Sequence, residues 1–205
     1  MKAEDRNDLG FSTPDVIRAF IALPIPEAVK DEIERVQVEL RRVLPEKLVR
    51  WTKREQFHLT LKFLGDVEAC RVKELTEALR EACSGFPALK LRAERVDCFP
   101  QPRFPRVAWV WVHDETEQLC VLQRIIESAV GSFTAQKADK KFTGHVTIAR
   151  ISGVKRPQIE ALASLVHALT ERQFGEWTAN EVRFIRSELF QSGAVHSVLA
   201  AFPLS

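Results

Sequence analysis

The chain has 205 residues, of which 45% are hydrophobic and 28% charged, and its formal net charge is +2. This composition is typical of a globular protein with enough residues to bury a sizeable core. The near-neutral charge argues against a protein that binds duplex nucleic acid along its phosphates without regard to sequence, because such proteins are usually strongly basic. A local basic patch around a single phosphate remains compatible with it.

Residues 1–16 are expected to form a mobile extension, followed by a single domain over residues 17–205. The opening residues are charged and lack the apolar stretch of a secretory signal. No apolar run approaches the roughly 20 residues that a membrane span requires. The cysteines form no C-x-x-C pair and no zinc-like spacing, so we expect reduced thiols in a cytoplasmic protein. They are Cys70, Cys83, Cys98 and Cys120.

The first half of the chain predicts two strands and two helices. Residues 17–23 are rich in β-branched and aromatic side chains, which favour a strand. Pro26 stands where a helix can begin, and Leu44-Pro45 stands where it should end. Between them runs one apolar stripe with helical spacing, made of Val29, Ile33, Val36, Leu40 and Val43. A strand at 58–64 and a helix at 67–82 follow.

The second half predicts more strands than helices. Residues 89–99 alternate apolar and charged positions, as a half-exposed strand does, and the proline-rich PQPRFPR after them must be a loop. The further elements expected are strands at 107–112, 142–151, 181–190 and 195–202 and helices at 115–130 and 157–169. Gln191-Ser192-Gly193 would form a hairpin turn between the last two strands. Strands mixed with helices in this way favour an α+β fold with mainly antiparallel sheets.

Two strand-like stretches each contain one histidine, FHLTLKFLG at 57–65 and FTGHVTIAR at 142–150. Histidine is unusual in an apolar run, because buried ring nitrogens need hydrogen-bond partners. Each half of the chain therefore contains a His-x-Thr strand followed by a helix and further strands. This coarse repeat predicts two similar lobes with a central groove between them.

Alternate side chains of a strand share a face, which divides each of these strands into a polar and an apolar side. In the first strand the polar side is predicted to consist of His58, Thr60 and Lys62. Its apolar side is predicted to consist of Leu59, Leu61 and Phe63. In the second strand the polar side consists of His145 and Thr147, opposite Val146 and Ile148. Two such strands facing each other would bring two imidazoles and two hydroxyls into one groove.

That set of groups suits acid–base chemistry at phosphorus. Histidine has an unperturbed pKa of about 6.5, so it can donate or accept a proton near neutrality. One imidazole would deprotonate the attacking hydroxyl or water while the other protonates the departing oxygen. The threonine hydroxyls would hydrogen-bond the non-bridging phosphate oxygens. We expect no metal and no other cofactor, since no carboxylate cluster has ligand spacing. His113, His167 and His196 lack this pattern and are expected to be structural or surface residues.

The motifs HLTL (58–61) and HVTI (145–148) resemble those of the two-histidine phosphoesterase superfamily. Within it, the sequence is most similar to the RNA 2′,3′-cyclic phosphodiesterases, historically called 2′-5′ RNA ligases. The stretches RAFIALPIPEAV, RWTKREQFHLTLKFLGDV, PRVAWVWV, HVTIAR and VRFIRSELFQSGAVH occur in the order of that family. The resemblance covers most of residues 17–202. It implies a bilobal α+β fold with pseudo-two-fold symmetry, two mainly antiparallel sheets flanked by helices, and the histidines in the central groove.

The same resemblance implies an activity and a role for each site residue. The family opens a terminal RNA 2′,3′-cyclic phosphate by hydrolysis and leaves a 2′-phosphomonoester. Carried over, His58 would be the general acid that protonates the leaving O3′, and His145 the general base that activates water. Thr60 and Thr147 would hold phosphate oxygens. The reverse reaction, ligation, exchanges the roles of the two histidines.

Three further positions bear on substrate binding. Arg150 matches an arginine that the family often carries five residues after the second histidine, against the nucleobase or near the phosphate. Strict alternation directs the side chain of Arg150 to the face opposite His145, because the two residues are an odd number of positions apart. A long side chain at the end of a strand can still reach around the strand to the other face. Lys62 shares the predicted face of His58 and would raise the local positive potential. The position of the family's stacking aromatic residue falls on Ile21, which has no π face.

Three functions therefore stand beside one another. The first is metal-independent hydrolysis of RNA 3′ ends that bear a 2′,3′-cyclic phosphate, or of nucleoside 2′,3′-cyclic phosphates. The second is 2′-5′ ligation of tRNA halves, which the same site would catalyse in the opposite direction. The third is a binding module that recognises phosphorylated RNA ends without turnover. We expect a monomer, since two lobes of one chain can bury each other's apolar faces.

Overall fold

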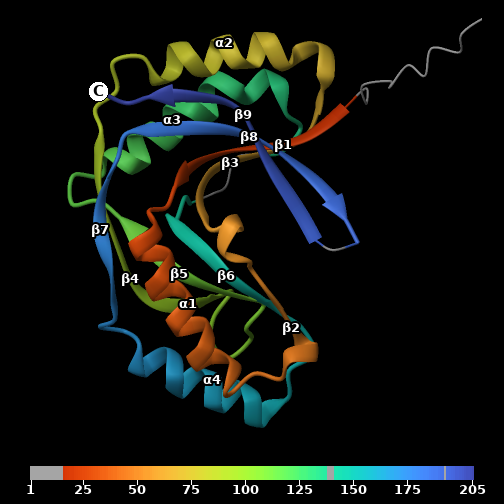
Figure 1. Cartoon of the computed structure of the whole chain (residues 1–205), viewed down its shortest axis with the longest axis vertical. Helices are drawn as coiled ribbons and strands as arrows, with labels where there is room; N and C mark the ends of the chain where they lie inside the picture. The colour runs from red at the N-terminus through yellow and green to blue at the C-terminus, as the bar shows by residue number, and fades with distance from the viewer. Residues whose placement is uncertain (1–15, 138–140, 192) are drawn as a thin grey trace, which may run out of the picture.

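The computed structural model describes residues 16–137, 141–191 and 193–205 (Figure 1). The expected N-terminal extension lies outside the described residues apart from Val16, which already belongs to the first strand. Ser192 of the expected hairpin turn also lies outside them. Within the described ranges, none of the helices is long and apolar enough to cross a membrane.

Four α-helices and nine strands follow one another in these ranges. In chain order they are β1 (Val16–Pro24), α1 (Glu27–Arg41), β2 (Val49–Trp51), β3 (His58–Glu68), α2 (Val72–Cys83), β4 (Leu89–Phe99), β5 (Val107–His113), α3 (Gln118–Val130), β6 (His145–Ile151), α4 (Arg156–Ala168), β7 (Gln173–Ala179), β8 (Glu181–Phe190) and β9 (Gly193–Pro203). Short 3-10 turns include η2 (Arg54–Gln56) and η3 (Ala69–Arg71).

Most of the expected elements are confirmed, several with shifted ends, and two strands are added. The second helix begins at Val72 and not at Val67, because Val67 still pairs with Ile17 at the end of β3 and faces the core. Strands β2 and β7 were not predicted. The first spans only three residues, and the second contains Gly175, which interrupts the alternation of a strand.

The strands form one antiparallel sheet in the order β7-β4-β5-β6-β3-β1-β8-β9, and β2 adds to β6. Two separate sheets were expected, but a single residue pair between β3 and β6, Leu59 with Val146, makes the two halves continuous. The order is symmetric about this junction, because β6 and β3 are followed by α4 and α2, and their neighbours β5 and β1 are followed by α3 and α1. The expected α+β fold with pseudo-two-fold symmetry is confirmed.

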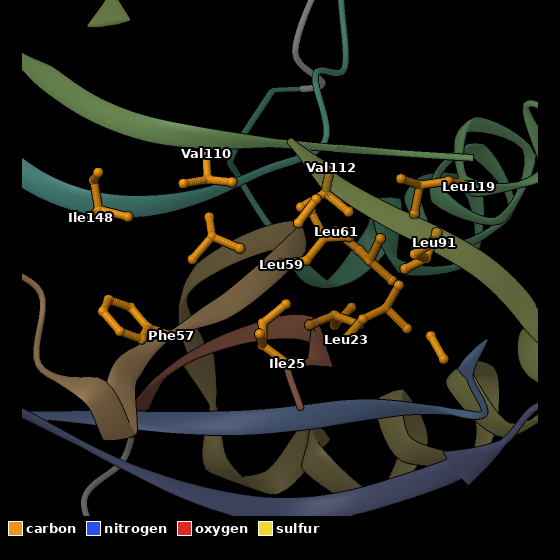
Figure 2. Packing of buried hydrophobic residues seen from close by; sticks show 14 of the residues in the cluster. Leu23, Ile25, Phe57, Leu59, Leu61, Leu91, Val110, Val112, Leu119 and Ile148 are labelled. Atoms are coloured by element: carbon orange, nitrogen blue, oxygen red, sulfur yellow. The ribbon is translucent and has the colours of Figure 1, made fainter. Parts of the chain in front are cut away.

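Helices cover one face of the sheet. Helix α1 packs on β6 and β7, and α4 packs near β4, whereas α2 and α3 pack on each other and against β9 and β3 (Figure 1). Leu59, Leu61, Val110 and Ile148 converge in the core from β3, β5 and β6 (Figure 2). Burying one such side chain contributes about 1.5–3 kcal/mol. The apolar side of each His-x-Thr strand therefore anchors it, and its polar side faces away from the core.

Candidate active site

The two His-x-Thr strands meet at the middle of the sheet. Strands β3 and β6 pair through Leu59 and Val146, whose side chains are completely buried. In an antiparallel pair, continuing this register by one residue sets His58 opposite Thr147, and Thr60 opposite His145. We call the side of the sheet that carries these four half-buried side chains the histidine face. The four residues singled out in the sequence thus lie together at one strand junction.

A β-bulge follows the threonine in each of these strands. On β3, Thr60 pairs with Ala22 and Lys62 pairs with Ile21, which leaves Leu61 as an extra residue. One extra residue reverses the alternation of every side chain beyond it. Lys62, Phe63 and Leu64 therefore face the opposite way from what strict alternation predicts, until a second extra residue at Leu64 restores the alternation.

Strand β6 has the same irregularity at the equivalent position. Thr147 pairs with Trp109 of β5 and Ala149 pairs with Ala108, which leaves Ile148 as the extra residue. The two strands also share one succession of buried and exposed side chains over the seven residues that start at each histidine. The bulge is therefore a repeated feature of the two lobes.

The predicted faces of Lys62 and Phe63 are wrong, because the prediction took no account of the extra residue. Lys62 points into the helix side and is only 6% exposed. There its Nζ lies 2.6 Å from Glu127 Oε1 and donates to the carbonyl of Gln136 at 3.1 Å. Phe63 is 48% exposed, and its ring centroid lies 5.7 Å from that of Phe20. Phe20 stacks on His58, so Phe63 belongs to the histidine face.

Arg150 follows the bulge at Ile148 in the way that Phe63 follows the bulge at Leu61. The odd offset from His145 therefore turns Arg150 to the histidine face, and its side chain is exposed. It pairs along the strands with Arg50 of β2 and Val107 of β5. Partial burial, and then the charge of Arg50, lower the pKa of Arg150. An arginine still carries its charge at neutral pH, because its ordinary pKa is above 12.

Each of the two histidines is anchored by a backbone group two residues before it. His145 Nδ1 lies 2.8 Å from the carbonyl oxygen of Thr143, and His58 hydrogen-bonds the backbone of Gln56. Because a carbonyl only accepts, Nδ1 of His145 carries the hydrogen in this bond. Nε2 is then the ring nitrogen of His145 that can take up a proton.

Aromatic rings enclose both imidazoles. The ring of Phe20 stacks on His58 with centroids 4.6 Å apart and an interplanar angle of 27°. Phe99 and Trp109 stack on each other at 4.5 Å and both meet His145 edge-on. These contacts remove water from the rings and fix their orientation.

Burial sets the protonation state of His58 in the free protein. It lowers the pKa of His58 to about 4, with smaller contributions from the nearby His196 and His145, while the bond to Gln56 acts in the opposite direction. His58 is therefore neutral at pH 7 in the absence of a bound anion. His196 was expected to be a structural or surface residue, and its half-buried ring lies 5.5 Å from that of His58. No sequence pattern marks this third imidazole.

Two cavities meet at His196. The larger, of about 330 Å³, extends from His58 past the end of β1 to α1 and β8. Its charged lining consists of Glu27, Lys30, Glu55 and Arg183. The smaller, of about 200 Å³, lies between η2 and the start of β9. The histidine face is thus open to small molecules beside His58.

The other groups that could do chemistry are arranged differently. In the described part of the chain, no cluster of three or more histidine, cysteine or acidic side chains could hold a metal ion. All four cysteines have free thiols. Burial raises the pKa of Cys83 to about 11 and that of Cys98 to about 12, so neither is a thiolate at neutral pH.

Comparison with known proteins finds a family model that matches each of the two His-x-Thr strands separately. The model of the LigT-like phosphoesterase family matches the chain twice, over residues 23–109 and over residues 110–196. The RNA 2′,3′-cyclic phosphodiesterase of Methanothermobacter thermautotrophicus is 27% identical over 188 residues, which make up 92% of this chain and 99% of that protein. Each half of the chain thus matches one family model around its own histidine.

Solved structures share the fold. The TT0787 protein of Thermus thermophilus superposes with a TM-score of 0.74 at 25% identity, over 92% of this chain and 98% of that one. LigT of E. coli, solved in complex with 3′-AMP, superposes with a TM-score of 0.73 at 20% identity, over 93% and 99% of the two chains.

Proposed function

This chain belongs to the family of LigT-like phosphoesterases, and on that premise we propose that it hydrolyses terminal 2′,3′-cyclic phosphodiesters of RNA or of nucleosides to 2′-phosphomonoesters. Curated relatives named RNA 2′,3′-cyclic phosphodiesterase support this activity. The observation that carries the proposal is the pairing of Leu59 with Val146. On one side of that pair His58 lies opposite Thr147, and on the other side Thr60 lies opposite His145, all on the histidine face.

The proposed reaction is an in-line displacement at phosphorus. A water molecule attacks the phosphorus while His145 takes its proton, and the P–O3′ bond breaks as His58 gives a proton to O3′. The 2′ oxygen keeps the phosphate. Thr60 and Thr147 donate their hydroxyl hydrogens to the non-bridging oxygens, where negative charge increases in the transition state.

A low pKa of His58 in the free protein is compatible with its role as the acid. The cyclic phosphate carries one negative charge, which favours the protonated imidazole beside it. At about 4 Å and an effective dielectric constant of about 20, this attraction is worth about 4 kcal/mol. Since one pKa unit corresponds to about 1.4 kcal/mol, binding would raise the pKa of His58 by about three units, from about 4 to near neutrality. His58 would thus be protonated as the substrate binds.

The nucleobase would stack on Phe63 or on Arg150, which lie toward opposite ends of the histidine face. The expected stacking position, Ile21, is fully buried in the core and offers no surface to a ligand. Phe63 presents an exposed ring on the histidine face, and Arg150 presents a guanidinium at the equivalent place in the other lobe. Bases stack on aromatic rings and on guanidinium planes without strong sequence preference. Either residue would therefore hold the terminal nucleoside of RNA ends that differ in base.

The test is a turnover assay on nucleoside 2′,3′-cyclic monophosphates and on an oligonucleotide with a cyclic-phosphate end, with identification of the product isomer. We expect 2′-phosphate products, and a loss of about 10²–10⁴-fold in His58→Ala and in His145→Ala. His167→Ala, at an exposed position of α4, is the matched control and should keep full activity.

Three outcomes would contradict the proposal. Full turnover in either histidine variant would remove the two-imidazole mechanism. Accumulation of 2′-5′-joined RNA from cyclic-phosphate and 5′-hydroxyl ends would favour ligation as the working direction. Tight binding of 2′-phosphate RNA by the unmodified chain, with no turnover of the cyclic form, would favour a binding module.

A further inference from the structure

His196 is packed directly against His58. It is carried by β9, opposite Ser187 of β8. Its ring meets the ring of His58 edge-on at 5.5 Å and 70°, and meets that of Phe20 at 5.0 Å and 70°. Because Phe20 stacks on His58 in turn, the three rings hold one another. His58 cannot rotate far without displacing one of the other two.

The position of His196 also gives it access to protons from solvent. Its half-buried side chain lines both the larger and the smaller cavity, whereas His58 borders only the larger one. Burial lowers the pKa of His196 as well. His196 is therefore neutral at pH 7 and takes up a proton only below the usual titration range of histidine.

We propose that His196 is a positioning residue that orients the ring of His58. When His196 is itself protonated, its charge opposes the protonation of His58 to an imidazolium. Two unit charges about 5.5 Å apart shift each other's titration by about half a pH unit even at the dielectric constant of water, and by more in a partly buried site. In acidic solution, where His196 is protonated, His58 of the free protein would thus stay neutral to a lower pH than burial alone would allow.

The charged groups around His196 are mostly paired with one another. A charge on His196 therefore acts most directly on His58. From α1, Lys30 and Glu27 face the larger cavity, where they form an ion pair at 2.7 Å. From β8, Arg183 is paired with Glu181 at 2.7 Å. Lys53 and Glu55, at η2, carry opposite charges beside the smaller cavity. These charges largely compensate one another, and the ring of His58 touches that of His196.

The experiment compares His196→Gln, which removes both ring and charge, with His196→Phe, which keeps a ring without the charge. His167→Gln, exposed on α4, is the matched control. The titration of the His58 ring is followed by NMR in the free protein, with its resonance assigned by its loss in His58→Gln. The pH dependence of kcat/KM is then measured on a nucleoside 2′,3′-cyclic phosphate.

We expect the His58 midpoint to rise by about half a pH unit or more in both His196 variants, because a repelling charge is gone. The limb of the kcat/KM profile that reports His58 should move in the same direction, and His196→Phe should keep more of kcat than His196→Gln, because the ring contact remains. The control should change neither. Both variants are checked for folding by circular dichroism.

The two readouts separate this inference from the proposed function on which its kinetic part rests. An unchanged His58 midpoint in folded His196→Gln and His196→Phe overturns the charge effect, whatever the turnover. Equal kcat in the two variants overturns the orienting role. A shifted midpoint in a chain that hydrolyses no cyclic phosphate supports the coupling of His196 to His58 and rejects the proposed function alone.

Discussion

Phe63 and Arg150 occupy equivalent places in the two lobes, each five residues after the histidine of its strand. A single extra residue, Leu61 in β3 and Ile148 in β6, turns both side chains to the histidine face. An aromatic ring and a guanidinium thus flank the two imidazoles. This relationship depends on the bulges, because a regular strand would direct both side chains toward the helices.

If Phe63 stacks on the nucleobase, Phe63→Leu should raise KM for nucleoside 2′,3′-cyclic phosphates with little change in kcat. Loss of one stacking contact costs about 1–3 kcal/mol, which corresponds to an increase in KM of about 5- to 150-fold. The control is Phe104→Leu, at a 65% exposed position in the loop between β4 and β5. An unchanged KM, or a fall in kcat at constant KM, would show that Phe63 does not bind the base.

The sequence predicted the histidine face well where alternation holds and poorly beyond the bulges. His58, Thr60, His145 and Thr147 all come before the extra residue, so period-two reasoning brought them to one side correctly. A bulge is a property of two strands and their register, and its position is not visible in the pattern of one strand. The faces of the residues after it therefore could not be predicted from alternation.

The sequence did not predict that His196 would lie beside His58, for a similar physical reason. His196 reaches His58 because β9 pairs with β8, β8 pairs with β1, and β1 pairs with β3. Local periodicity identified the final strand but carries no information about which strands become neighbours. Helix positions were easier, because α1 and α4 have local start and stop signals that act over a few residues.

Lys62 offers a test of the corrected face. On the histidine face it would support activity, but the structure buries it against Glu127. Lys62→Met should destabilise the chain by about 2–3 kcal/mol in urea unfolding, somewhat below the value for a fully buried pair, because the Glu127 side chain is 21% exposed. Activity per folded molecule should stay unchanged. Restored stability in the double variant with Glu127→Gln would confirm that the loss comes from an unpaired carboxylate, and a large fall in kcat would contradict this placement.

Removal of either threonine hydroxyl should slow turnover by a similar factor in both lobes. Thr60→Val and Thr147→Val keep the side-chain shape and delete one donor to the phosphate oxygens. By comparison with other oxyanion donors, kcat should fall by about 10²–10³-fold, with a much smaller change in KM. Thr178→Val, at an exposed position of β7, is a matched strand control. Activity that survives in both single variants would remove the threonines from the mechanism.

The low pKa of His58 also predicts how the stability of the free protein depends on pH. In the unfolded chain this histidine titrates near 6.5, whereas in the folded chain it titrates at about 4. Between these values the unfolded state binds more protons, so the free energy of unfolding should fall as the pH is lowered from about 6.5 to about 4. Above about 6.5, His58 is neutral in both states and contributes no pH dependence.

Urea unfolding of the parent chain and of His58→Gln at several pH values checks this dependence of stability on pH. The variant should lose part of the slope in that window, and inorganic phosphate, as an anion beside His58, should reduce the slope in the parent chain only. An identical slope in both chains would mean that His58 titrates normally in the folded protein.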